Sequence, residues 1–141
     1  MSAVRAGGLR LSSARRLVLE ALFAAHEPVA AERIASGLDG HLPPSDLASV
    51  YRNLGVLEEA GLVCELRLGR APGRYAPAAG APREYAACER CGAMTEVDPK
   101  ALDGVRAAVR AALGYEARFG HFPLVGLCPG CAGAQSDVRA G

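Results

Sequence analysis

Two Cys-x-x-Cys pairs place the tightest limit on how this chain of 141 residues can fold. They read Cys88-Glu-Arg-Cys91 and Cys128-Pro-Gly-Cys131, and 36 residues, 92–127, lie between them. Such an interval has room for a strand, a helix and a returning strand, which bring the second pair back beside the first. Four thiolates at ~2.3 Å from one ion complete a tetrahedral zinc site without an open coordination position. The spacing therefore predicts one structural zinc ion per chain, with a redox dithiol as the alternative.

Charge and hydropathy exclude several classes of protein. Sixteen basic side chains against fifteen acidic ones give a net charge of +1, so bulk charge predicts no nucleic-acid partner and any basic surface is local. The N-terminal residues lack the apolar core of a secretion signal, and no later run approaches the ~18 apolar residues that span a bilayer. We therefore expect a cytoplasmic protein without a membrane partner, whose five cysteines stay reduced rather than forming a disulfide framework.

Hydrophobic periodicity predicts helices followed by a hairpin in the first three-fifths of the chain. The predicted helices are Ser13–Ala25, Ala30–Leu38 and Asp46–Ala60, and the predicted strands are Leu62–Leu68 and Arg74–Ala76. Ser45 is the expected cap of the third helix, and Gly61 is its expected stop. Three helices followed by a hairpin form the winged helix-turn-helix arrangement.

Polar side chains gather on one face of the third predicted helix. Its apolar positions recur at steps of three and four, which turns Ser49, Arg52 and Asn53 to the opposite face. Tyr51 lies on the flank of that face. These groups can reach phosphates, thymine methyl groups or base edges, and Arg15 belongs to a basic stretch that precedes them. Double-stranded DNA is therefore a candidate partner, and an ordinary solvated helix face is the alternative.

The second half of the chain has the pattern of a small α/β unit. Its predicted elements are a strand ending at Cys88, a strand at Met94–Val97, an amphipathic helix at Pro99–Leu113, and strands near Glu116–Phe122 and Pro123–Leu127. A unit of ~60 residues buries only ~60% of its unfolded surface and is marginal alone. We therefore expect a metal ion, a partner subunit or both to stabilise it.

The fifth cysteine, Cys64, lies in the first predicted strand of the hairpin. Alternation places it on one face with Leu66 and Leu68, where a small buried hydrophobic side chain is one interpretation. The other interpretation is a redox-sensing thiol, which needs exposure and a cationic neighbour such as Arg67.

Four segments resemble the successive signatures of the ferric uptake regulator (Fur) family. They are Arg10–Arg15, Leu47–Val63, Cys88–Gly92 and Gly126–Cys131, in the family's order. The resemblance implies a homodimeric, metal-responsive transcriptional repressor that binds a DNA operator. It also implies a winged-helix DNA-binding domain, a hinge, and an α/β dimerisation domain that holds zinc through four cysteines.

The same resemblance assigns roles to individual side chains. Ser49-Val-Tyr-Arg52 matches the family's Thr-Val-Tyr-Arg motif, which implies that Tyr51 and Arg52 contact bases and backbone. Arg15 matches a first-helix Arg that lies near the phosphates.

The predicted fold class is therefore α+β, a winged helix-turn-helix domain followed by a small α/β dimerisation domain with a four-Cys zinc site. The small residues of Pro77–Pro82 mark the linker between them. The predicted divisions are a DNA-binding domain at 1–76, a hinge at 77–83, a dimerisation domain at 84–133 and a flexible tail at 134–141.

The chain departs from the family pattern where members usually bind the sensed metal. Members carry a His-rich run with His-x-His before the first Cys-x-x-Cys pair, and here those positions read Pro82-Arg-Glu-Tyr85. Pro28 and Ala76 stand at two further positions that often supply ligands in relatives. The resemblance therefore implies weakened or altered metal sensing.

Relatives also have a second divalent-metal site inside the dimerisation domain. The resemblance places Glu84, Asp103 and His121 at or near its positions, and Glu96 is a further donor. Such N/O donors could hold a second divalent ion weakly, and solvated carboxylates beside a surface His are the alternative.

Together these patterns predict a sequence-specific DNA-binding repressor. An enzyme is not expected, because the sequence has no Ser/His/Asp set, phosphate loop or paired acid–base motif. The alternative function is a zinc-stapled interaction module or thiol redox sensor without metal-dependent operator binding.

Overall fold

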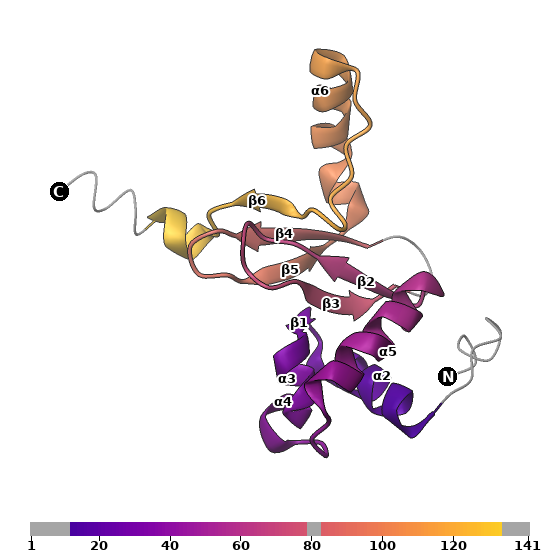
Figure 1. Ribbon diagram of the computed structural model, residues 1–141. Coiled ribbons are helices and arrows are strands. Elements are labelled where there is room, and N and C mark those ends of the chain that lie inside the picture. The colour runs from indigo at the N-terminus through magenta and orange to yellow at the C-terminus, as the bar shows by residue number, and fades with distance from the viewer. Residues whose placement is uncertain (1–11, 79–82, 134–141) are drawn as a thin grey trace. The chain divides into compact units, whose positions relative to one another are not determined.

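The computed structural model describes residues 12–78 and 83–133 and divides the chain into two units (Figure 1). The first unit is Met1–Leu66 with Pro72–Ala81, and the second is Arg67–Ala71 with Pro82–Gly141. The predicted tail, most of the predicted linker and the family-like residues before Ser12 lie outside the described residues.

Helix α2 spans Ser13–Ala25, as the apolar spacing predicts. The Ser12 hydroxyl accepts a hydrogen bond from the Arg15 N–H at 3.2 Å and caps the first turn. Val18 and Leu22 are buried on the inner face of the helix, within the core of the first unit. The helix ends at His26, which adopts the left-handed conformation that commonly terminates helices.

The second predicted helix is broken, so the prediction of one helix over Ala30–Leu38 is wrong. Helix α3 spans Ala31–Ala35, and a short turn, α4, spans Gly37–Gly40. Gly37 has φ +69°, and a Cβ atom there would lie 2.0 Å from the carbonyl oxygen of Leu42. The Leu42 N–H donates to the Gly37 carbonyl at 2.8 Å, so the chain turns tightly at a position that only glycine fits.

Helix α5 spans Leu47–Glu59 and carries the predicted DNA-facing residues. Its cap is Asp46, not Ser45, because the Asp46 carboxylate accepts the Ser49 N–H at 3.0 Å. Val50, Leu54 and Leu57 are buried against the rest of the first unit. The helix therefore uses one apolar stripe for packing and leaves the opposite face to solvent.

The predicted hairpin supplies the central strand and one edge strand of a three-stranded sheet. Strand β2 (Val63–Leu66) pairs antiparallel with β3 (Arg74–Pro77), and β3 pairs antiparallel with the short strand β1 (Val29–Ala30). In the order β1-β3-β2, the segment after α2 is hydrogen-bonded to the hairpin through β1. This arrangement completes a winged helix-turn-helix unit, as predicted.

The second unit has a sheet in the order β5-β4-β6. Strand β4 (Glu84–Cys88) pairs antiparallel with β5 (Met94–Val97) and parallel with β6 (Leu124–Gly126). A parallel pair needs a long crossover, and the 3-10 turn η1 (Pro99–Leu102) with helix α6 (Asp103–Leu113) supplies it. The strand predicted near Glu116–Phe122 is absent, because that described segment lies outside both ladders of the sheet.

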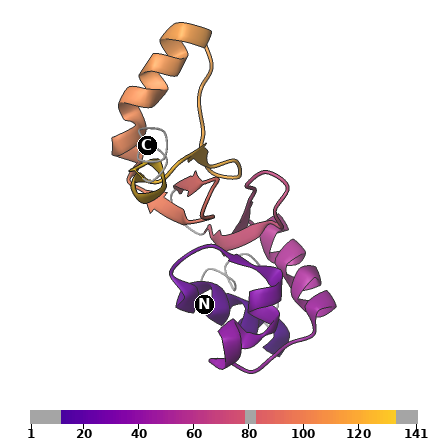
Figure 2. The same ribbon diagram turned by 90° about the vertical axis from the view of Figure 1, so that its left-hand side faces the viewer.

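Helix α6 stands away from the sheet of its own unit (Figures 1 and 2). It buries none of its residues, and only Leu102 at its foot, in η1, is buried. Its predicted apolar face is present but uncovered: the Leu113 side chain is 67% exposed. The second unit therefore presents apolar surface that the described chain does not cover.

Candidate metal centre and nucleic-acid interface

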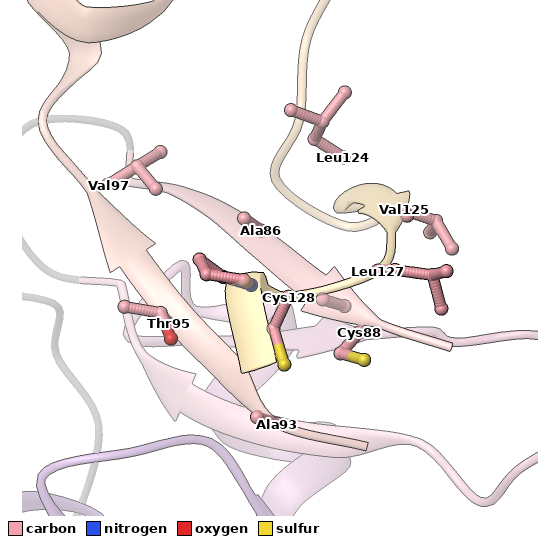
Figure 3. Close-up of a pocket in the computed structure, with 12 residues that line it drawn as sticks. Ala86, Cys88, Ala93, Thr95, Val97, Leu124, Val125, Leu127 and Cys128 are labelled. Carbon is pink, nitrogen blue, oxygen red and sulfur yellow. The ribbon is translucent and has the colours of Figure 1, made fainter. Parts of the chain in front are cut away.

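The fold of the second unit brings the four predicted zinc ligands to one place. Cys88 ends β4, and Cys128 follows β6, its parallel neighbour, with Cys88 opposite Gly126 in the register. Parallel strands end at the same edge of a sheet, so each strand delivers a Cys-x-x-Cys pair to that edge. Figure 3 shows Cys88 and Cys128 with their sulfur atoms near one another.

The distances among the sulfur atoms fit a tetrahedral metal ion. All four Sγ atoms lie within 4.8 Å of one another, and the Cys91 and Cys128 sulfurs are 3.9 Å apart. A tetrahedron with ~2.3 Å zinc–sulfur bonds has edges of ~3.8 Å. The Cys91 N–H points at the Cys88 sulfur at 3.4 Å, and Gly92, with φ +79°, closes the turn that permits this.

The thiols of this cluster have perturbed and opposed acidities. Backbone N–H groups of Cys128 and Cys91 lower the pKa of Cys88 to about 6. The neighbouring Cys128 and Cys88 thiols raise the pKa of Cys131 to about 12. Several thiolates this close repel one another unless a cation lies among them. The donor set therefore fits a soft-ligand dication such as zinc.

The exposed face of α5 carries two of the predicted DNA contacts. The Tyr51 side chain is 43% exposed, and Arg52 is exposed beside it. The Tyr51 hydroxyl donates a hydrogen bond to Glu32 Oε1 at 3.1 Å. Glu32 lies on α3, and no pattern in the sequence pointed to it, because an acidic residue in a first helical turn is ordinary.

The other predicted DNA-binding residues are half-buried and contact one another. Arg15 Nε donates to Asn53 Oδ1 at 3.1 Å, which links α2 to α5. Asn53 Nδ2 in turn donates to the Ser49 carbonyl oxygen at 2.9 Å. These bonds hold Arg15 and Asn53 between the two helices.

The four donors of the predicted second metal site do not come together as one group. Among the described residues, the four cysteines are the only group of three or more His, Cys, Asp or Glu side chains placed to hold one ion. Glu84 and Asp103 both contact Arg106, and Glu96 Oε1 lies 3.5 Å from Arg83 Nε. His121 is exposed, and its ring packs edge-on against Phe122 at 4.5 Å. No pattern in the sequence points to Arg106.

Cys64 lies on β2 opposite Ala76 and is half-buried. Val63 and Leu66 are the buried residues of that strand. The Cys64 thiol, predicted to share a face with Leu66, is less buried than Leu66. Its role as a redox sensor stays a prediction.

Comparison with known proteins identifies the family. The model of the ferric uptake regulator family matches residues 6–119. The chain belongs to that family. Members of the Fur family are transcription regulators and not enzymes, so the chain is a DNA-binding transcription regulator of a metal-responsive family, as predicted.

Several curated Fur-family proteins match nearly the whole chain. The peroxide operon regulator of Bacillus subtilis is 30% identical over 125 residues, which cover 89% of this chain and 86% of that protein. The peroxide-responsive repressor PerR of Staphylococcus saprophyticus is 26% identical over 131 residues, covering 93% and 88%. The ferric uptake regulation protein of Campylobacter jejuni is 25% identical over 138 residues, covering 96% and 88%.

Solved Fur structures share the fold. The Vibrio cholerae ferric uptake regulator superposes with a TM-score of 0.69 at 21% identity, covering 90% of this chain and 98% of that one. The Pseudomonas aeruginosa regulator with manganese has a TM-score of 0.66 at 25% identity, covering 91% and 96%. Within the described parts of this Fur-family chain, no helix is long and apolar enough to cross a membrane.

Proposed function

We propose that this Fur-family chain is a homodimeric transcriptional repressor with one structural zinc ion per chain. The observation that carries the proposal is the convergence of four cysteine sulfurs within 4.8 Å, in the same chain as an α5 helix with an exposed Tyr–Arg pair. Cys88, Cys91, Cys128 and Cys131 would hold the ion. When bound, zinc supplies the positive charge that lets four thiolates lie together, which stabilises a small unit.

The exposed face of α5 is the proposed reading surface for operator DNA. Arg52 would contact a phosphate, and Tyr51 a base edge or a thymine methyl group. Glu32 fixes the Tyr51 hydroxyl, and the Arg15–Asn53 bond fixes the angle between α2 and α5. In this proposal Arg15, Ser49 and Asn53 act mainly by positioning the helix.

The uncovered apolar surface of the second unit supports a homodimer. The exposed apolar side chains are Val105, Leu113, Tyr115, Phe122, Leu124 and Val125. An apolar hollow of about 520 Å³ also lies over the sheet, lined by Ala86, Val97, Leu124 and their neighbours (Figure 3). Patches of this kind mark interaction sites in soluble proteins. Two copies joined here would address half-sites ~34 Å apart on a pseudo-palindrome.

We further propose that metal sensing is weaker than in relatives with the full His-rich run. Tyr85 is buried and takes part in the sheet, and Ala76 offers no donor atom. Arg83 brings a positive charge beside Glu96, which disfavours an incoming cation. Because a ligand shifts an equilibrium only by its differential affinity for two states, missing donors reduce the attainable response.

Footprinting on genomic fragments with the zinc-loaded full chain tests the proposed function. We expect a discrete protected site at moderate salt. Arg52→Ala should weaken binding broadly and reduce the salt slope by ~1, whereas Tyr51→Ala should cost mainly at one base pair. Arg110→Ala removes an equal charge from the second unit and should leave the footprint unchanged. Uniform weak binding that vanishes at moderate salt would support the zinc-stapled interaction module instead.

A titration of divalent metals, and separately of peroxide, would test the proposed sensing. The zinc-loaded protein should bind its operator without added metal. A rise in affinity of ~100-fold (~2.7 kcal/mol) at micromolar free ion would show that the sensing site is intact.

A further inference from the structure

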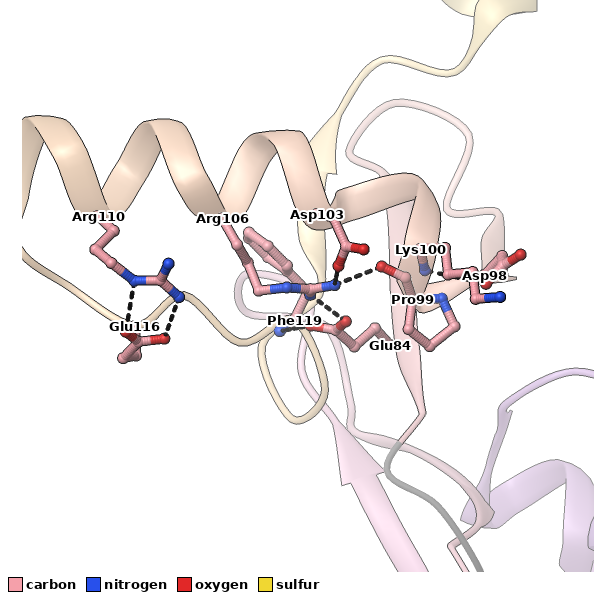
Figure 4. A network of polar contacts seen from close by, with 9 residues as sticks. All are labelled: Glu84, Asp98, Pro99, Lys100, Asp103, Arg106, Arg110, Glu116 and Phe119. Carbon is pink, nitrogen blue, oxygen red and sulfur yellow. Dashed lines mark hydrogen bonds and ion pairs between the residues drawn. The ribbon is translucent and has the colours of Figure 1, made fainter.

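The guanidinium of Arg106 contacts two acidic side chains of the second unit. Arg106, on α6, contacts Glu84 through Nη1 and donates from Nη2 to Asp103 Oδ1 at 3.0 Å. The same Nη2 also donates to the carbonyl oxygen of Pro99. Figure 4 shows the guanidinium between these three oxygen acceptors. Two carboxylates and a carbonyl are an acceptor set that hard divalent cations also take.

The pair at the centre of this network is largely shielded from water. The Arg106 and Glu84 side chains are 19% and 12% exposed. The second oxygen of Glu84 accepts the Phe119 N–H at 3.0 Å, so both carboxylate oxygens are engaged. A shielded ion pair whose acceptors are all used is much stronger than an exposed one, and losing one member leaves an uncompensated charge.

The network also holds α6 to the rest of its unit, a role that apolar packing does not fill here. Helix α6 buries none of its residues, so few apolar contacts hold it. Arg106 joins α6 to β4 through Glu84, and Glu84 joins β4 to the segment after α6 through Phe119. The crossover between the two parallel strands is therefore tied down by polar bonds centred on one cation.

We propose that Arg106 is a built-in cation that closes the carboxylate cluster of the second unit to divalent metals. A divalent ion does not fit the residues as they stand, because binding it would require expelling the guanidinium from its three acceptors. Two donors of the predicted site, Glu84 and Asp103, thus belong to an intramolecular ion network, while Glu96 pairs with Arg83 and His121 packs against Phe122. This ion network keeps α6 in place without a second metal, whether or not the chain binds DNA.

Manganese binding to the zinc-loaded full chain tests this proposal. Mn²⁺ prefers oxygen ligands, does not compete well for thiolates, and reports its binding by electron paramagnetic resonance. The wild type should show no tight Mn²⁺ site at micromolar ion and no change in Tm. In Arg106→Gln the Tm should fall, and Mn²⁺ should bind and restore part of the loss. A Glu84→Gln change added to Arg106→Gln should abolish that binding.

Two controls keep the test decisive. Arg110→Gln breaks the exposed pair with Glu116 on the same helix, where Arg110 Nε lies 2.7 Å from Glu116 Oε1, and it should acquire no Mn²⁺ site. Arg106→Lys keeps the charge without the planar fork, so it should be destabilised yet stay closed to Mn²⁺. The proposal is wrong if the wild type binds Mn²⁺ tightly and Glu84→Gln removes that binding. It is also wrong if Arg106→Gln is as stable as the wild type and indifferent to Mn²⁺. None of these readouts involves an operator, so they are independent of the proposed repressor function.

Discussion

Replacing Asn53 by Ala should destabilise the first unit without removing a direct DNA contact. The change deletes the bond from Arg15 Nε, which is charged and half-buried, and the bond to the Ser49 carbonyl. A hydrogen bond to a charged group contributes ~1.5–3 kcal/mol, and the lower end applies at a half-buried site. Alanine recovers ~0.5 kcal/mol of helix propensity. The net loss is ~1 kcal/mol, or ~4–8 °C in the Tm of a unit this size.

Thermal unfolding of the zinc-loaded protein would measure this loss, with hydrogen exchange of the α2 and α5 amides to assign it to the first unit. Arg52→Ala is the matched control, because Arg52 is an exposed neighbour on the same helix. It should change the free energy of unfolding by less than ~0.5 kcal/mol, and it should weaken DNA binding. Asn53→Ala should lower the Tm, and at temperatures where it is folded it should bind the operator as tightly as the wild type. If Asn53→Ala melts like the wild type but loses tenfold or more in operator affinity, Asn53 contacts DNA and the positioning role is refuted.

Three further outcomes are expected. Cys131→Ser should retain less than one zinc per chain by atomic emission and lose amide protection in the second unit only; full zinc content in a folded dimer would contradict the staple. Leu113→Glu should shift the sedimentation coefficient to that of a monomer, while Ala107→Glu, elsewhere on α6, should not. Burial and the Glu65 carboxylate raise the pKa of Tyr75 to about 12. Because the unfolded value is ~10, this stability is present below pH ~10 and is lost towards pH ~12, so Tyr75→Phe should flatten that decline in urea midpoints.

Local signals in the sequence were sufficient for most of the regular elements. Ser12 and the apolar spacing after it define α2, and β5 begins and ends where its pattern predicts. The break in the second helix was missed because Gly37 is one glycine among seventeen, and only the approach of Leu42 makes it essential. The segment Glu116–Phe122 has strand-like residues but lies outside the sheet, and no local pattern reveals that.

The cysteine cluster and the Arg106 network differ in how far the sequence could predict them. The cysteine cluster follows from spacing alone, since a Cys-x-x-Cys pair is already nearly a ligand pair. The Arg106 network could not be predicted, because Glu84 and Arg106 are 22 positions apart and meet only through the crossover fold. The same holds for the bond between Arg15 and Asn53, which are 38 positions apart, and the DNA contact of Asn53 stays a prediction.

The tight turn at Gly37 makes the start of α5 sensitive to a residue that lies outside that helix. Any side chain at position 37 would push the backbone at Leu42 and Pro43, three to four residues before the Asp46 cap. In a genetic screen for loss of regulation, substitutions at this glycine should therefore recur. They should lower the stability of the first unit, because the backbone at Leu42 and Pro43 must shift to make room for a Cβ atom. The tolerance of position 37 to mutation is thus set by a carbonyl oxygen five residues further along the chain.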